Sequence, residues 1–314
     1  MQRSETNYPL VYIVILNYNG KRWLEPCLRS LLSTDYGNFK VVVVDNASID
    51  GSVKLVKKLF PEVEIIINPS NYGFSEGNNI GIRKALAEKA GYLVLLNPDT
   101  WVEPSWLARM VDVAESEPTV GILGPVQLNY TDSDFNSWTR TALLPHLDKL
   151  RIPEQAGDWI AVEWVEGSCF VVKKDVFEAI GLLDPIYFAF YEEIDFCRRA
   201  VCRGYQTALV PRSRIHHYRG GSWQANQRLA REREYRCDRS QFIYNMTDPR
   251  KTLFANFYCY LLTLAVKAKV LLQDFSVIGA WKLIRMQIDV FGISGKLLSK
   301  WRRERSLLRK VVSG

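Results

Sequence analysis

The stretch Tyr92–Trp101, YLVLLNPDTW, places five largely apolar residues directly before Asn-Pro-Asp. The apolar run suits a buried strand, whereas proline cannot extend a central strand and an aspartate is costly to bury. Asp99 therefore stands at the end of a core strand, where a carboxylate needs a specific reason to be.

Three earlier segments follow the same pattern. LVYIVILNYNG (10–20), KVVVVDNASIDGS (40–52) and VEIIINPSNYGFSEGNN (63–79) each begin as an apolar strand. The first two continue into polar sequence, and the third is expected to continue into a glycine-rich loop. Helical spacing follows them in KRWLEPCLRSLLS, in residues 52–60 and in NIGIRKALAEKAG, which we expect Gly91 to close. Apolar strands that alternate with helices predict an α/β fold with a mostly parallel central sheet flanked by helices.

Each predicted strand ends in Asn or Asp. Ligands of open α/β sheets bind beyond the carboxyl ends of the strands, so these ends predict one shared site. A single such residue is more often a turn or a cap, but four strand ends in register weaken that explanation. The residues are Asn17, Asp45, Asn68 with Asn71, and Asn97 with Asp99.

The position of Asp99 suggests a bound cation. A carboxylate 4 Å from a phosphate charge costs about 4 kcal/mol at an effective dielectric near 20. An aspartate aimed at a diphosphate is therefore reasonable only with a cation between the two. Carboxylate oxygens together with substrate phosphates are the usual ligands of Mg²⁺ and Mn²⁺, so either metal is the expected cofactor.

The segment FYEEIDFCRR supplies three acids, Glu192, Glu193 and Asp195. Acids also favour the first turn of a helix, which is the structural alternative. However, these acids follow an aromatic run, and apolar walls raise the pKa of a carboxyl group. A raised pKa suits a general base that takes a proton from a hydroxyl.

The segment RIHHYRGGSW follows a predicted strand at 206–210 and is expected to be a loop. A neutral imidazole from His216 or His217 could complete a metal site, or either histidine could be structural. VEWVEGSCFVVKKDVFEAIGLLD predicts a strand, a turn, a second strand and a short helix ending near Gly181. From residue 224 onward the chain is expected to be mostly helical.

Six motifs, in order, resemble the family 2 glycosyltransferases of the GT-A fold, in particular their rhamnosyltransferase-like branch. They are VVVVDNASIDGS, NYGFSEGNN, LLNPD, WVEGSCFVVKKDVFEAIGLLD, YEEIDFCRR and HHYRGGS, spread over residues 10–222. The resemblance implies a metal-dependent, inverting transfer of a sugar from a nucleotide diphosphate donor. It places the catalytic domain at 1–223 and a helical, basic region at 224–314.

The resemblance also assigns roles by position. Asp99 ends the family's DxD metal motif, in which Asn97 replaces the first Asp, and His217 fits the metal-site histidine better than His216 does. Glu193 takes the place of the catalytic base, with Asp195 as the alternative base. Nucleotide-sugar binding is assigned to Asn17, Asp45, Asn71, Asn78, Asn97 and Asp99, and acceptor binding to Glu192, Trp164 and Gly167.

The charge is unevenly distributed. Residues 201–314 carry 22 Lys and Arg against 7 Asp and Glu, whereas residues 1–200 carry 19 against 27. Apolar residues are interleaved with the cations of the tail 294–312, SGKLLSKWRRERSLLRKVV, which fits an anionic membrane surface. Packing on the core or in a homodimer is the alternative. The apolar run Leu253–Val266 is too short for a convincing transmembrane helix.

Several other classes are less consistent with the sequence. No nucleic-acid-reading motif accompanies the basic residues. A nucleotidyltransferase would be expected to carry a glycine-rich first loop, where this chain has NYNG, and an inactive relative is a further alternative. Scattered cysteines and a polar N-terminus suggest a cytoplasmic protein, and the basic tail suggests that it lies at the inner face of the membrane. The family resemblance implies a saccharide or polyprenyl-linked acceptor in the synthesis of cell-surface polysaccharide.

Overall fold

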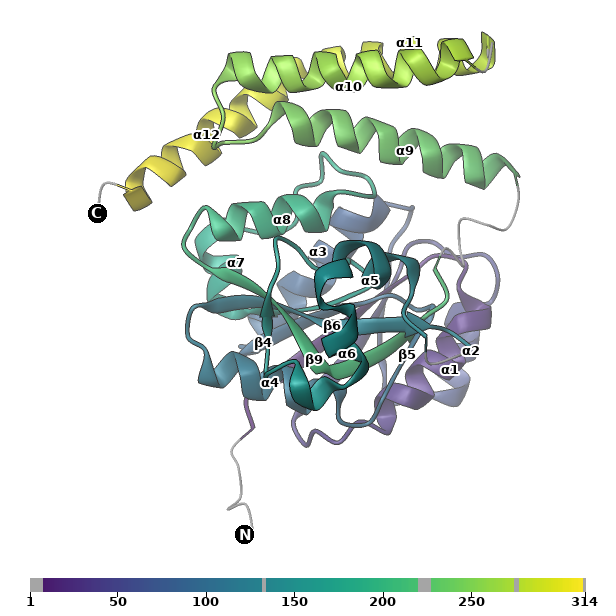
Figure 1. Ribbon diagram of the computed structural model, residues 1–314. Coiled ribbons are helices and arrows are strands. Elements are labelled where there is room, and N and C mark those ends of the chain that lie inside the picture. The colour runs from purple at the N-terminus through teal and green to yellow at the C-terminus, as the bar shows by residue number, and fades with distance from the viewer. Residues whose placement is uncertain (1–7, 132–133, 220–226, 274–276, 313–314) are drawn as a thin grey trace. The chain divides into compact units, whose positions relative to one another are not determined.

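The computed structural model describes residues 8–131, 134–219, 227–273 and 277–312. The chain divides into two compact units (Figure 1). The first comprises Met1–Ile186 with Glu192–Gln224, and the second Tyr187–Tyr191 with Ala225–Gly314. The domain boundary expected at 223/224 falls at 220–226, outside the described residues.

The first unit is built around one sheet of strand order β3-β2-β1-β4-β8-β6-β9-β5, with β7 paired to β9. Strands β1 to β4 run parallel, β6 runs parallel to β9, and β8 is antiparallel to both β4 and β6. The strands are β1 (Val11–Asn17), β2 (Phe39–Asp45), β3 (Glu64–Ile67), β4 (Tyr92–Leu96), β5 (Thr100–Val102), β6 (Val120–Asn129), β7 (Ile160–Ala161), β8 (Cys169–Lys173) and β9 (Gln206–His217).

Helices cover both faces of this sheet, because alternate strand residues feed two separate cores. Val11, Ile13 and Ile15 pack with α1, α2 and α4, whereas Tyr12 and Val14 pack with α3, α7 and α8. This arrangement confirms the predicted α/β fold. The helices are α1 (Lys21–Leu32), α2 (Ser52–Leu59), α3 (Gly73–Ala87), α4 (Trp106–Ser116), α5 (Ser137–Ala142), α6 (Leu147–Arg151), α7 (Lys174–Ile180) and α8 (Glu192–Val201).

Helix α3 differs from the expectation, because most of the glycine-rich segment is helical rather than a loop. A Cβ added at Gly77 would lie 2.5 Å from Leu16 Cδ1, and one at Gly81 would lie 2.3 Å from Val14 Cγ1. These glycines therefore let the helix pack closely on β1. The helix ends at Ala87 instead of running to Gly91, and Lys89 takes the left-handed conformation after it.

Strand β9 also differs from the expectation, since it continues through both histidines. The predicted strand ended at Val210, directly before Pro211, and proline cannot donate to a sheet ladder. In the structure the pairing with β6 is interrupted there, so that Val210 pairs with Pro125 and Arg214 with Val126. The strand resumes beyond the interruption and carries His216 and His217 at its end.

The second unit is helical, as expected, and consists of α9 (Gln227–Met246), α10 (Leu253–Gln273), α11 (Val277–Gly292) and α12 (Ser294–Val312). Helices α9, α10 and α11 meet around Tyr260, whose ring lies 5.3 Å from Phe242 and 5.9 Å from Phe291. In the described residues, Leu253–Val270 is long and apolar enough to cross a membrane, although only 11% of it is buried. The helix is thus longer than the apolar run suggested.

Candidate active site

The ends of β1 and β2 are joined by a buried polar cluster. Asn17 and Asp45 are neighbours in the parallel register, and Asn17 Nδ2 donates to Asp45 Oδ1 at 2.7 Å. The same amide lies 2.9 Å from Ser52 Oγ, and Asp45 Oδ2 accepts the Ser48 backbone N–H at 2.9 Å. These contacts fix the chain that leaves each strand.

Asparagines form a second cluster at the start of α3. Asn71 Oδ1 accepts the Gly73 backbone N–H at 2.8 Å and lies 3.2 Å from Asn46 Nδ2. Asn78 is buried on the helix and donates to the Phe74 carbonyl at 2.9 Å. Asn71 therefore orients the helix start, whereas the amide N–H of Asn78 is used inside the helix.

Asp99 and His217 lie together, although 118 positions separate them in the chain. Strand β5 runs antiparallel to β9 and pairs Thr100 with His217, which brings Asp99 Oδ1 within 3.3 Å of His217 Nε2. The Asp99 carbonyl accepts the Tyr218 N–H at 3.0 Å. Both residues are more than 90% buried, so the pair is held firmly at the sheet edge.

The hydrogen bonds around His217 bear on what can lie beside Asp99. Gln127 Oε1 accepts from Asn136 Nδ2 at 3.1 Å and lies 3.3 Å from His217 Nδ1. An imidazole that donates from Nδ1 to this oxygen turns the Nε2 lone pair toward Asp99. Two facing lone pairs repel, so the arrangement calls for a proton or a cation between them.

This pair fits a divalent cation. Adjacent ligands of an octahedral Mg²⁺ site lie about 3.0 Å apart at metal–ligand distances of about 2.1 Å, close to the 3.3 Å between Asp99 Oδ1 and His217 Nε2. No group of three or more His, Cys, Asp or Glu in the described residues could hold a metal. Asp99 and His217 would thus supply part of a coordination shell that substrate phosphates complete.

His216 is next to the pair in the chain but does not join it. His216 stacks on Trp101, with ring centroids 3.6 Å apart, and its Nδ1 lies 2.8 Å from the Asn129 carbonyl. Successive residues of a strand point to opposite sides, so only His217 faces Asp99. The backbone N–H of Asn97 donates to the Ser168 carbonyl at 2.8 Å. The geometry favours His217 over His216 as a metal ligand.

Glu193 lies in the first turn of α8 against Gly167. A Cβ added at Gly167 would lie 3.4 Å from Glu193 Cδ, so a glycine leaves the carboxyl group its space. Burial, together with the charge of Glu166, raises the pKa of Glu193 to about 7 despite backbone N–H groups that favour the charged form. Its Oε2 atom is buried without a hydrogen-bond partner in the described part of the chain. These properties suit a base that works near neutral pH.

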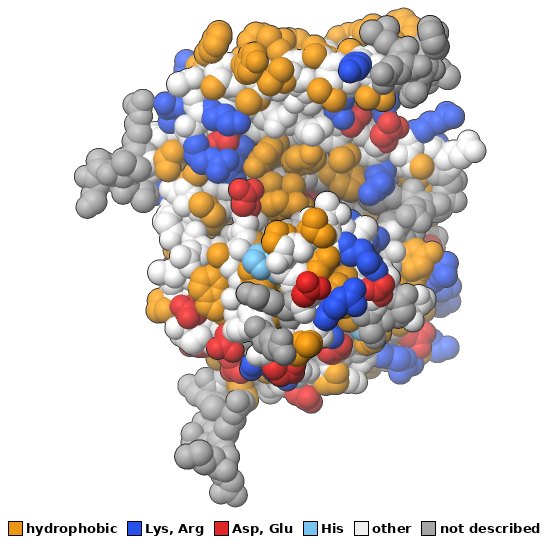
Figure 2. Space-filling model, viewed as in Figure 1, with side chains coloured by type: hydrophobic (Ala, Val, Ile, Leu, Met, Phe, Trp, Pro, Cys, Tyr) orange, Lys and Arg blue, Asp and Glu red, His pale blue; other side chains and the backbone are white. Residues whose placement is uncertain are grey.

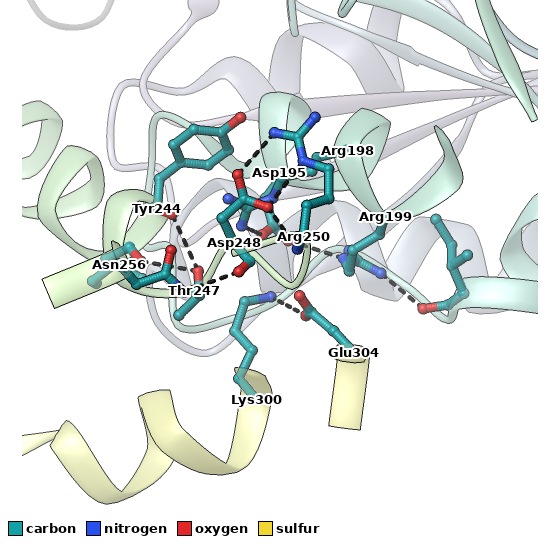
Figure 3. A network of polar contacts seen from close by, with 12 residues as sticks. Asp195, Arg198, Arg199, Tyr244, Thr247, Asp248, Arg250, Asn256, Lys300 and Glu304 are labelled. Carbon is teal, nitrogen blue, oxygen red and sulfur yellow. Dashed lines mark hydrogen bonds and ion pairs between the residues drawn. The ribbon is translucent and has the colours of Figure 1, made fainter. Parts of the chain in front are cut away.

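Glu192 and Asp195, on the same helix, are in opposite environments. Burial, and then the charge of Glu193, raises the pKa of Glu192 well above its ordinary value. Asp195 accepts from Arg198 at 2.9 Å and from Arg199 at 2.9 Å, and all three side chains are buried (Figure 3). With both oxygens in ion pairs, Asp195 is poorly suited to the alternative role of base.

A family profile decides the class of the chain. The model of glycosyl transferase family 2 matches residues 12–181, more than half of the sequence. The chain belongs to glycosyl transferase family 2. This confirms the family and the enzyme class that the motifs suggested, and it disfavours the nucleotidyltransferase alternative.

Named relatives of this glycosyltransferase act on sugars. A low-salt glycan biosynthesis hexosyltransferase of Haloferax volcanii is 32% identical over 197 residues, which cover 60% of each chain. An N-acetylglucosaminyl-diphospho-decaprenol L-rhamnosyltransferase of Mycobacterium tuberculosis is 25% identical over 67% of this chain and 76% of its own.

Solved structures agree on the fold. A mannosyltransferase from Pyrobaculum calidifontis, in complex with GDP-Man and Mn²⁺, overlays with a TM-score of 0.57 at 18% identity and covers 98% of this chain and 86% of its own. TarS of S. aureus with UDP gives a TM-score of 0.57 at 11% identity, over 96% and 91% of the two chains. At these identities the overlays confirm the GT-A fold.

The sequence did not predict three residues of the candidate site. Glu166 Oε1 lies 4.0 Å from His217 Nδ1 and 3.1 Å from Arg219 Nη2, and the charge of Glu166 helps to raise the pKa of Glu193. Gln127 and Asn136, described above, complete the surroundings of His217. Glu166 directly precedes Gly167 in a quoted motif, so its position was visible although its role was not. Of the expected acceptor residues, Gly167 contacts Glu193, whereas the Trp164 ring lies 5.5 Å from that of Trp138.

Proposed function

We propose that this glycosyltransferase moves rhamnose or another hexose from a nucleotide diphosphate donor to a saccharide or polyprenyl-linked acceptor, with inversion and with Mg²⁺ or Mn²⁺. The observation that carries the proposal is the buried pair of Asp99 and His217. Glu166 connects this pair with the base. Its Oε1 lies 4.0 Å from His217 Nδ1, and its negative charge helps to raise the pKa of Glu193. In this proposal the cation ligand His217 and the base Glu193 share Glu166 as a neighbour.

The reaction is a single displacement. Glu193 takes the proton of an acceptor hydroxyl, whose oxygen attacks the anomeric carbon of the donor. The bond from that carbon to the diphosphate oxygen breaks, and the nucleoside diphosphate leaves with the bonding electrons. A divalent cation held by Asp99 and His217 would stabilise the charge that develops on the leaving diphosphate.

The remaining expected residues would position the donor and the acceptor. Asn17, Asp45 and Asn71 hold the loops at the strand ends, and we assign them to the nucleotide together with Asn78 and Asn97. Because Asp45 is tied to Asn17 and Ser48, it offers the nucleotide a preorganised carboxylate. Glu192, Trp164 and Gly167 are assigned to the acceptor.

The proposed setting is the inner face of the cell membrane, in the synthesis of surface polysaccharide. One relative's name includes a decaprenol-linked acceptor, which supports a lipid-linked acceptor here. The expected membrane contact of the basic tail could involve only part of α12. Lys300 is not available for it, because it is buried and paired with Glu304 at 2.6 Å (Figure 3). Ser222, which was quoted with the histidines, lies outside the described residues.

A donor panel tests the proposal. The purified protein is incubated with Mg²⁺ or Mn²⁺ and several nucleotide sugars, and the release of nucleoside diphosphate is followed. We expect release from one class of donor, dependent on the metal and accelerated by acceptor. A protein that binds donors by calorimetry but releases nucleotide from none of them would be the inactive relative, and the proposal would fail.

A further inference from the structure

The outer side of α10 is apolar along most of its length. Its exposed large side chains recur in pairs every four residues, so they form one stripe along the helix. Phe254 is 80% exposed and Val266 is 63% exposed. The stripe includes Phe254, Phe257, Tyr258, Leu261, Leu262 and Val266.

Helix α11 carries a matching stripe, formed by Trp281, Ile284, Ile288 and Phe291, each more than half exposed. The two helices pack on each other and on α9, and the hydroxyl of Tyr260 on α10 donates to Gln287 on α11. Figure 2 shows hydrophobic side chains gathered along the edge where α10 and α11 lie in Figure 1. We call the two stripes together the apolar face. Exposed apolar surface of this extent marks an interaction site.

The opposite side of α10 carries polar side chains that make hydrogen bonds and an ion pair within the second unit. Asn256 Nδ2 donates to the Asp248 carbonyl at 2.9 Å, and Thr263 accepts from Asn245 at 2.8 Å. Lys267 pairs with Asp238 of α9 at 2.6 Å. A helix crossing a bilayer would have to move these groups into hydrocarbon or carry α9 with it. The polar contacts instead suit a helix that lies flat, with only the apolar face buried in lipid.

The charge of the unit favours an anionic surface. Residues 225–314 carry 18 Lys and Arg against 7 Asp and Glu. The described acids are paired internally, for example Glu234 with Lys282 at 2.7 Å and Asp248 with Arg250 at 2.8 Å. The surplus is therefore positive and includes exposed Lys269 and Lys296. A second copy of this chain would bring the same positive charge to the contact, whereas an anionic lipid surface would neutralise it.

We propose that the apolar face of α10 and α11 inserts into the interfacial layer of a membrane that contains anionic lipids, with both helices lying in its plane. This assigns the membrane contact to α10 and α11, and gives the basic residues of α12 a supporting electrostatic part. Aromatic side chains such as Tyr258 and Trp281 suit the level of the lipid headgroups. The inference does not depend on the identity of the donor or of the base.

The test is sedimentation of the full chain with vesicles of phosphatidylcholine that contain or lack phosphatidylglycerol. We expect binding to the anionic vesicles. The double substitution Phe254→Ser with Trp281→Ser should weaken it at least about tenfold, since two exposed aromatic side chains no longer enter lipid. The substitution Lys296→Glu should weaken binding at low salt and change it little at high salt.

Leu32→Ser on α1 is the matched control, because it removes a hydrophobic side chain that is 46% exposed on the first unit, and its binding should equal that of the wild type. Circular dichroism checks that each variant is folded, and nucleotide release from a soluble donor reports the active site separately. The inference is wrong if the wild type does not bind anionic vesicles at low salt, or if the double variant binds like the wild type. It is also wrong if sedimentation velocity shows a dimer that the double variant separates, since the face would then join two copies.

Discussion

The two units depart from the usual distribution of side chains in opposite directions. The first buries carboxylates, among them Glu192 and Glu193, each with a buried oxygen that has no partner in the described residues. The second exposes hydrocarbon on α10 and α11 while it pairs its polar groups inside. Both arrangements cost free energy in the isolated chain. Each cost supports one of the two proposals, a base that receives the proton of a hydroxyl in the first unit and a lipid contact in the second.

The largest expected effect concerns the base. Glu193→Gln keeps the shape of the side chain but removes its ability to take a proton, so the rate of transfer should fall by about 10²–10⁴-fold. Steady-state rates measure the loss, and calorimetry should show unchanged donor affinity. Full activity in this variant would mean that the Glu193 carboxyl group is not the base.

The metal pair comes next. Asp99→Asn weakens the attraction for a cation, and we expect kcat to fall about 10²–10³-fold. The metal concentration for half-maximal rate should rise in Asp99→Asn and in His217→Ala, and His216→Ala is the matched control on the adjacent position. Equal metal dependence in the His217 and His216 variants would contradict the assignment.

A third prediction concerns stability and contrasts two acids of α8. Asp195→Asn leaves two buried guanidinium groups short of a counter-charge, which should lower the free energy of unfolding by about 3–5 kcal/mol. Glu193 affects stability in the opposite way, because its pKa is raised in the folded state. Its contribution to the free energy of unfolding is fully present below pH about 4.5 and is lost as the pH rises through about 7. Glu193→Gln should therefore unfold no more easily than the wild type at pH 8. Urea titrations of both variants check this, and similar destabilisation of the two would remove the distinction.

The smallest effect is the pH dependence of the reaction. Because the pKa of Glu193 is about 7, kcat/KM should rise about tenfold per pH unit at low pH and level off above neutrality. The residual rate of Glu193→Gln should lack this limb. A wild-type profile that is flat between pH 5 and 8 would show that a different step or group controls the rate.

The sequence predicted those parts of the fold and site that follow from local pattern. The apolar runs located β1, β2 and β4, and parallel register then placed Asn17 beside Asp45 without further information. Residue chemistry left both His216 and His217 as possible partners of Asp99, and only the family resemblance favoured His217, because the interruption at Pro211 concealed the continuation of β9. The role of Glu166 could not be predicted either, since it depends on the loop that carries Glu166 meeting the end of β9 and the start of α8.

The exposure of apolar side chains on α10 was the feature that the sequence predicted least. The run in α10 contains enough apolar residues for a core helix, and composition does not tell which side of a helix finds partners. Asn256 lies within the apolar run, and in the structure it is on the inner side of the helix, where its Nδ2 donates to the Asp248 carbonyl. The outward stripe is left exposed because α9 and α11 pack on other parts of α10.

The register of β5 against β9 has a consequence for the order of biosynthesis. Asp99 leaves the ribosome long before His217, and nothing holds the two together until the last strand of the sheet pairs with β5. A nascent chain that ends before β9 thus has only one of the two proposed cation ligands. Under the proposed mechanism, donor turnover would begin only once the sheet is complete, and unfinished polypeptides would not consume activated sugar.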